Sequence, residues 1–120
     1  MEILIITLKS IYGAFFLFAG VMHFLKPKFF YPFIPKFFPR ELSNYGAGLL
    51  EIVVGLFIFI PAFSSYAALG IITLLTIFLP IHIWDYMKEK PAIGPKRLAL
   101  IRIPLQFLLM YGAYFIYINT

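Results

Sequence analysis

Six side chains within the apolar stretches of this 120-residue chain are of types that can do chemistry. They comprise two imidazoles, two carboxylates, one guanidinium and one amide: His23, Glu51, His82, Asp85, Arg102 and Gln106. Such groups exchange protons, hold the polar head of a ligand or form buried ion pairs. Because an ionisable residue in the middle of a long apolar helix costs about 3 kcal/mol, it indicates a specific role and a nearby partner.

The spacing of these residues predicts which of them share a helix face. Arg102 and Gln106 are four residues apart and His82 and Asp85 are three apart, so each pair lies on one side of a helix. Glu51 and Arg102 are charged residues inside their apolar stretches with no exit to the surface nearby, whereas Lys9, in the other half, can extend outward along its stem. We therefore predict an ion pair between Glu51 and Arg102, since either charge would be costly alone at that depth.

This cluster has a functional and a structural interpretation. In the functional one, Glu51 and Arg102 form the centre of a ligand site, and His23, His82 and Gln106 complete its hydrogen bonds. In the structural one, the salt bridge fixes the register of the helices. The histidines near the helix ends then serve as caps or reach the membrane surface.

Metal and thiol chemistry are not expected from this sequence. The histidines and acids do not follow a His-x-x-Glu or His-Glu-x-x-His pattern, so no metal site is predicted. The chain contains no cysteine and therefore no disulfide or thiol redox pair. No phosphate-binding glycine loop or haem motif identifies a cofactor, although a quinone or a lipid would suit a polar site in an apolar chain.

The elements that must position these residues are membrane helices. Hydrophobic residues make up 62% of the chain and charged residues 12%, against about 25% charged in a typical soluble domain. A bilayer core needs about 20 apolar helical residues, and backbone groups in lipid must bond internally. We therefore predict an all-α fold, a single membrane domain over residues 1–120 and an antiparallel four-helix bundle. The expected spans are 3–25, 45–63, 66–86 and 98–118.

The segment between the first two expected helices, residues 26–44, is rich in proline and aromatic residues. It contains Pro27, Pro32, Pro35 and Pro39, which exclude a regular spanning helix. Its aromatic and basic side chains are typical of the head-group zone of a membrane. We expect an interfacial lid or a re-entrant loop; a simple aromatic membrane anchor is the alternative.

The net charge of +5 predicts orientation and not binding to nucleic acid, because the basic residues gather in two loops between apolar stretches. The positive-inside rule places both long loops in the cytoplasm and both termini outside the cell (inner) membrane. With this topology, all six polar residues lie in the cytoplasmic half. The loop residues are Lys26, Lys28, Lys36, Arg40, Lys88, Lys90, Lys96 and Arg97.

Several short motifs in this order resemble the DoxX family of small four-helix membrane proteins. They are FAGVMHFLKP over 18–27, FFYPFIPKFFP over 29–39, YGAGLLEIVVGLFIFIP over 45–61 and RIPLQ over 102–106. The resemblance implies a membrane bundle with a polar site at His23, Glu51, Arg102 and Gln106. Some members of that family are associated with thiosulfate:quinone oxidoreductase. His82 stands where the family pattern has asparagine.

Two classes of function follow. In the first, the chain is a small subunit of a membrane oxidoreductase complex that binds a quinone-like or lipidic molecule. A redox partner protein would supply electrons, because the chain has no electron carrier of its own. In the second, it is a non-enzymatic assembly, chaperone or lipid-binding protein whose polar cluster is structural, acting alone or as a homo-oligomer. A transporter is less favoured, because the sequence has no inverted repeat. Whether the chain is an enzyme stays open.

Overall fold

The computed structural model describes residues 1–120 and is entirely helical, which confirms the predicted all-α class. It contains five α-helices, one short 3-10 helix and no strand. In chain order these are α1 (Glu2–Leu25), α2 (Pro27–Phe30), the 3-10 helix η1 (Tyr31–Phe33), α3 (Arg40–Phe57), α4 (Ser64–Met87) and α5 (Lys96–Ile118).

Three of these helices, α1, α4 and α5, are long and apolar enough to cross a membrane. They have 24, 24 and 23 residues, which corresponds to about 35 Å at a rise of about 1.5 Å per residue and exceeds the hydrocarbon core. Their outward faces carry exposed apolar side chains such as Ile3 and Phe18. α3 does not meet the same criterion, because its 18 residues include Arg40, Glu41 and Glu51.

The position of α3 differs from the predicted span of 45–63, since the helix covers Arg40–Phe57. It begins directly after Pro39, a residue that cannot continue an earlier helix but is tolerated at a helix start. It ends early although apolar residues follow, because residues 58–63 form the turn into α4. Ile58 is fully buried in the core, so this apolar residue anchors the turn and does not extend the helix.

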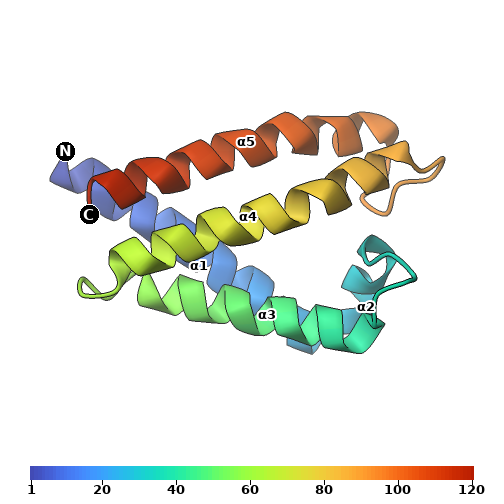
Figure 1. Ribbon diagram of the computed structural model, residues 1–120, viewed down its shortest axis with the longest axis horizontal. Helices are drawn as coiled ribbons and strands as arrows, with labels where there is room; N and C mark the ends of the chain where they lie inside the picture. Colours follow the sequence, from blue (N-terminus) through green and yellow to red (C-terminus); the bar gives the residue numbers. More distant parts are fainter.

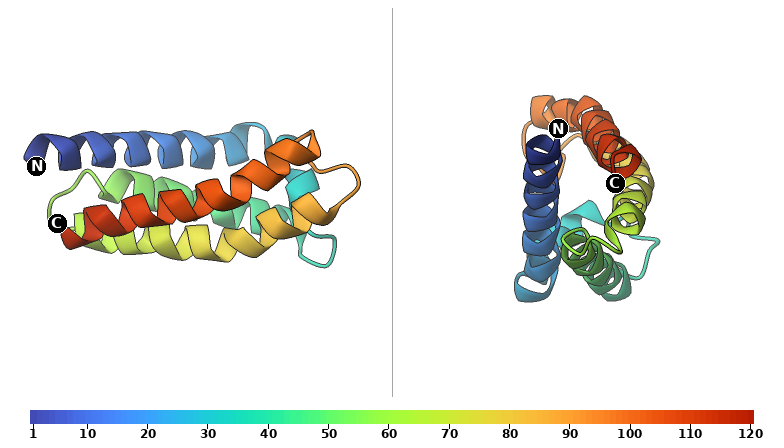
Figure 2. Two further views of the ribbon diagram at one scale, coloured as in Figure 1. Left: turned by 90° about the horizontal axis from the view of Figure 1, so that it is seen from above. Right: turned by 90° about the vertical axis from the view of Figure 1, so that its left-hand side faces the viewer.

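The helices run antiparallel, with both termini and the α3–α4 turn at one end of the molecule (Figure 1). The connection through α2 and the α4–α5 loop lie at the other end, which we call the loop end. α1 packs mainly against α3 and α4 mainly against α5, whereas the two pairs touch each other much less. The end-on view shows this division (Figure 2).

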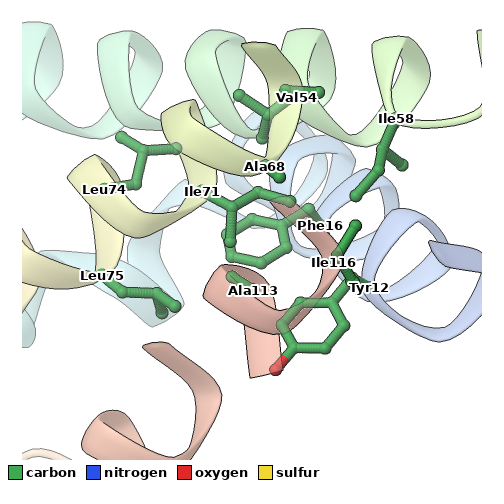
Figure 3. Packing of buried hydrophobic residues seen from close by; sticks show 11 residues of the cluster. Tyr12, Phe16, Val54, Ile58, Ala68, Ile71, Leu74, Leu75, Ala113 and Ile116 are labelled. Carbon is green, nitrogen blue, oxygen red and sulfur yellow. The ribbon is translucent and has the colours of Figure 1, made fainter. Parts of the chain in front are cut away.

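The hydrophobic core joins the two helix pairs on the side of the molecule nearer the termini. Phe16 of α1 lies among side chains of the other three long helices (Figure 3). Within the first pair the backbones approach closely, because a Cβ atom on Gly20 would lie 2.7 Å from the carbonyl oxygen of Gly48. The apolar packing therefore holds the two helix pairs together at one end, and other residues make the contacts at the loop end.

Candidate functional site

A cavity of about 780 Å³ lies among the four long helices and the α2–η1 segment. Of the 26 residues that line it, 18 are hydrophobic. Five of the six polar residues singled out from the sequence are in its wall: His23, Glu51, His82, Arg102 and Gln106. A second concavity, of about 1290 Å³, lies on the outer side of the connection between η1 and α3 and contains none of the six.

The first polar cluster joins α1 to α3 through His23. Its Nε2 lies 2.9 Å from Glu51 Oε1, and its Nδ1 lies 2.6 Å from Asn44 Oδ1. The Asn44 amide group donates to the backbone oxygen of His23 at 2.8 Å, which leaves Oδ1 as the acceptor. His23 Nδ1 must therefore carry a proton.

The second ring nitrogen of His23 shares one proton with Glu51. Either an imidazolium faces a carboxylate, or a neutral imidazole accepts a hydrogen bond from a carboxylic acid, and both arrangements have zero net charge. Glu51 Oε2 makes no hydrogen bond within the chain, yet no side-chain oxygen or nitrogen is both buried and unpartnered. Because Glu51 lines the cavity, this oxygen is available to a ligand there.

The second cluster joins α4 to α5 through Arg102. Its Nη1 lies 3.5 Å from Asp85 Oδ2, and its Nη2 contacts His82 Nδ1. Arginine only donates, so His82 Nδ1 is the acceptor and the neutral ring carries its proton on Nε2. Gln106, one turn further along α5, donates to the backbone oxygen of Leu75 at 2.8 Å and keeps its own side-chain oxygen free.

Asp85 is fully buried and does not line the cavity. Its carboxylate accepts hydrogen bonds from the backbone N–H groups of Ala92 at 2.7 Å and Ile93 at 3.5 Å, and Lys88 Nζ lies 3.3 Å away. Asp85 thus ties the α4–α5 loop to the end of α4 and holds Arg102 from behind. Its role in this site is to position Arg102.

The aromatic segment between α1 and α3 covers both clusters. The ring of Phe30 stacks on His23 with centroids 3.7 Å apart and an interplanar angle of 18°. Phe33 places its ring centroid 5.1 Å from the guanidinium carbon of Arg102. The segment predicted as an interfacial loop contains the short helices α2 and η1, and its rings form the loop-end wall of the cavity.

The predicted ion pair between Glu51 and Arg102 is wrong. Glu51 pairs with His23 and Arg102 with Asp85, because each helix finds its polar partner on the neighbour against which it packs. Matching residues by depth placed both groups in the same half of the bundle. It could not show that they belong to different helix pairs.

Asn44 and the two covering rings were missed by reasoning from sequence. Asn44 is completely buried and lies seven residues, or two helical turns, before Glu51. A helix that begins at Arg40 places both residues on one face, whereas the span predicted from apolar residues begins at residue 45, after Asn44. No pattern distinguishes Phe30 and Phe33 from the other aromatic residues of the segment.

Comparison with known proteins corrects the family assigned from sequence motifs. No curated protein and no solved structure matches the chain. The resemblance to DoxX is wrong, since the family comparison finds a different family. The motifs behind it are short combinations of Gly, Pro, His and Glu, which membrane helices also use for close packing and polar contacts. Residues 12–117 match the Domain of unknown function (DUF8561), and the chain belongs to that family.

Proposed function

We propose that this chain is a multi-pass protein of the cell (inner) membrane and that its cavity binds one amphiphilic molecule of a quinone-like or lipidic kind. In this proposal α3 joins the three apolar helices in an antiparallel four-helix membrane bundle. Its polar residues Asn44 and Glu51 are buried, while its exposed residues include Leu49, Leu50 and Leu56. A helix with this division can lie among the others in lipid.

The charge distribution supports a cytoplasmic position for the loop end. Eight Lys and Arg residues lie in or beside the two connections at that end: Lys26, Lys28, Lys36, Arg40, Lys88, Lys90, Lys96 and Arg97. Cytoplasmic loops are enriched in these residues, so both termini would be outside.

The cavity with its polar residues is the observation that carries the proposal. Its volume of about 780 Å³ is within the usual range for a small-molecule site, which is about 300–1,000 Å³. An apolar lining with a few converging polar groups is typical of such sites, and here all four long helices contribute to the wall. An amphiphile would place its head at these groups and its tail along the apolar side chains.

The chain itself would bind this molecule and hold a proton beside it. Glu51 and His23 share one proton at the cavity wall, so they can donate or accept a proton at the head of the ligand. As a small subunit of an oxidoreductase complex, the chain would provide this site while a partner protein supplied the electrons.

A second candidate is a non-enzymatic assembly or lipid-binding protein in which the clusters are structural. It is favoured by the division of polar contacts, because the His23 cluster ties α1 to α3 and the Arg102 cluster ties α4 to α5. In this case removal of the polar groups would loosen the helices without affecting a bound molecule.

Native mass spectrometry of the purified protein, followed by extraction of bound molecules, tests the proposal. Ala19 lines the cavity and Ala14 is an exposed residue of the same helix outside it, so Ala19→Phe fills the cavity and Ala14→Phe is the matched control. We expect one amphiphile on the wild-type protein and on Ala14→Phe, and its loss from Ala19→Phe. Equal occupancy in all three proteins, or none in the wild type, would contradict the proposal.

A further inference from the structure

Arg102 has more hydrogen-bond donors than the protein uses. A guanidinium group carries five N–H donors, and only two contacts are made, to Asp85 and to His82. Nε takes part in neither contact, and because no side-chain nitrogen is both buried and unpartnered, this nitrogen is accessible. Because Arg102 lines the cavity, this donor is available to an acceptor that the protein does not supply.

The charge around Arg102 is only partly compensated. Asp85 is the one acid near it, and the same carboxylate also pairs with Lys88 and accepts two backbone N–H groups. Two positive side chains thus share one negative one. The other acid in the wall, Glu51, shares a proton with His23, and that pair is neutral overall. Lys88 lies outside the cavity, but Lys26 and Arg102 both line it, and Asp85 is the one unneutralised carboxylate near them, so the wall has an excess of about one positive charge.

His82 contacts the guanidinium through one ring nitrogen, and its remaining donor is on the far side of the ring. Its Nδ1 is occupied by Arg102, so its proton is on Nε2, which has no hydrogen-bond partner in the chain. Phe33 faces the guanidinium group, and aromatic faces leave the N–H edge of arginine free for acceptors in the plane. The N–H edge of a guanidinium matches the two oxygens of a carboxylate, which binds arginine in a bidentate manner.

The shape of the cavity fits a single apolar chain behind this head. Along α1 its lining extends from Lys26 to Phe15, which is about 16 Å at about 1.5 Å per residue. The polar groups are nearer the loop end, and the part toward the middle of the helices is apolar. Phe15, Phe18 and Leu105 line the cavity and are 55%, 67% and 45% exposed, so the cavity reaches the outer apolar surface between α1 and α5.

We infer that the ligand is a long-chain carboxylate whose head is bound by Arg102 and whose tail runs toward Phe15. This inference rests on the proposed function and selects one class within it. An uncharged quinone head would leave the excess positive charge without a counterion. A phosphate monoester would bring between about one and a half and two negative charges, more than this wall can balance.

Binding of palmitate, hexadecanol, hexadecyl phosphate and a decyl quinone to the purified full-length protein in a non-ionic detergent tests the inference. Arg102→Gln is the test variant, and Arg97→Gln is its control, because Arg97 is an exposed residue of the same helix outside the cavity. We expect the wild type and Arg97→Gln to bind palmitate at least about tenfold more tightly than the other three, the worth of a charge-assisted hydrogen bond. In Arg102→Gln the preference should disappear while hexadecanol still binds, which shows that the variant is folded.

Arg102→Lys provides a second test, since it keeps the charge but not the bidentate geometry. We expect it to retain part of the preference for palmitate. Equal binding of palmitate and hexadecanol to the wild type would overturn the inference but leave the proposed function intact. Tighter binding of hexadecyl phosphate or of the quinone would do the same, as would a preference that survives in Arg102→Gln. If none of the four molecules binds and Ala19→Phe behaves like Ala14→Phe, the proposed function itself fails.

Discussion

The hydrogen bond between His23 and Glu51 contains one proton that the two side chains share. The Asn44 oxygen fixes the Nδ1 proton of His23, so the only variable proton lies between Nε2 and Glu51 Oε1. A site that can move one proton without gaining net charge is tolerated in an apolar environment, where an isolated charge is not. This arrangement explains how an acid and a histidine can both line an otherwise apolar cavity.

Two substitutions of Glu51 distinguish the hydrogen bond to His23 from the proton that the two residues share. In Glu51→Gln the amide group donates to His23 Nε2, so the hydrogen bond persists, and we expect stability within about 1 kcal/mol of the wild type. In Glu51→Leu the Nε2 atom loses its partner, with an expected loss of about 1–3 kcal/mol. Unfolding of the purified proteins in detergent measures both changes. Equal stability of Glu51→Gln and Glu51→Leu would show that the contact contributes nothing.

Individual polar residues of the site were predictable, whereas their partners were not. Polar residues in apolar stretches are expensive, and this criterion found the five that line the cavity. Pairing depends on which helices are neighbours, and that is decided by apolar packing and glycine contacts spread along whole helices. Asn44 escaped for a related reason, since it is uncharged and lies in the first turns of α3, where polar residues are common.

Unequal packing between the helices gives the cavity its shape. α1 and α3 approach closely through small residues, while α1 and α5 touch little. The α2–η1 segment then covers the loop end with Phe30 and Phe33, one ring on each polar cluster. Proline and aromatic content predicted a segment at the membrane surface, but the choice of rings depends on the register of α2, which four residues do not determine.

Two glycine substitutions test the packing between α1 and α3, and we expect opposite effects. A Cβ atom on Gly20 would lie 2.7 Å from the Gly48 carbonyl oxygen, so Gly20→Ala forces the helices apart and lowers stability. A Cβ atom on Gly46 of α3 would meet nothing within 4 Å, so Gly46→Ala gains up to about 1 kcal/mol from reduced chain entropy. Unfolding in detergent gives both values. A destabilised Gly46→Ala, or a Gly20→Ala as stable as the wild type, would contradict the packing described.

The molecule as a whole has a packed half, nearer the termini, and a half that contains the cavity, nearer the loop end. The buried apolar cluster joins both helix pairs toward the termini, and the polar clusters each serve one pair toward the loop end. The antiparallel order of the helices, with both termini at one end, was predictable from the number of apolar stretches. The cavity was not, since it arises where two helix pairs diverge, and no local pattern records that divergence.

Because the chain contains no cysteine, its orientation can be tested with single cysteines. Thr120 is exposed at the C-terminus and Lys90 is exposed in the α4–α5 loop, so Thr120→Cys and Lys90→Cys report the two ends of the molecule. If the basic loop end is cytoplasmic, a membrane-impermeant maleimide will label Thr120→Cys in intact cells and Lys90→Cys only after the membrane is opened. Labelling of both residues in opened membranes is the control for reactivity. The reverse pattern in intact cells would place the loop end outside, and with it the polar half of the cavity.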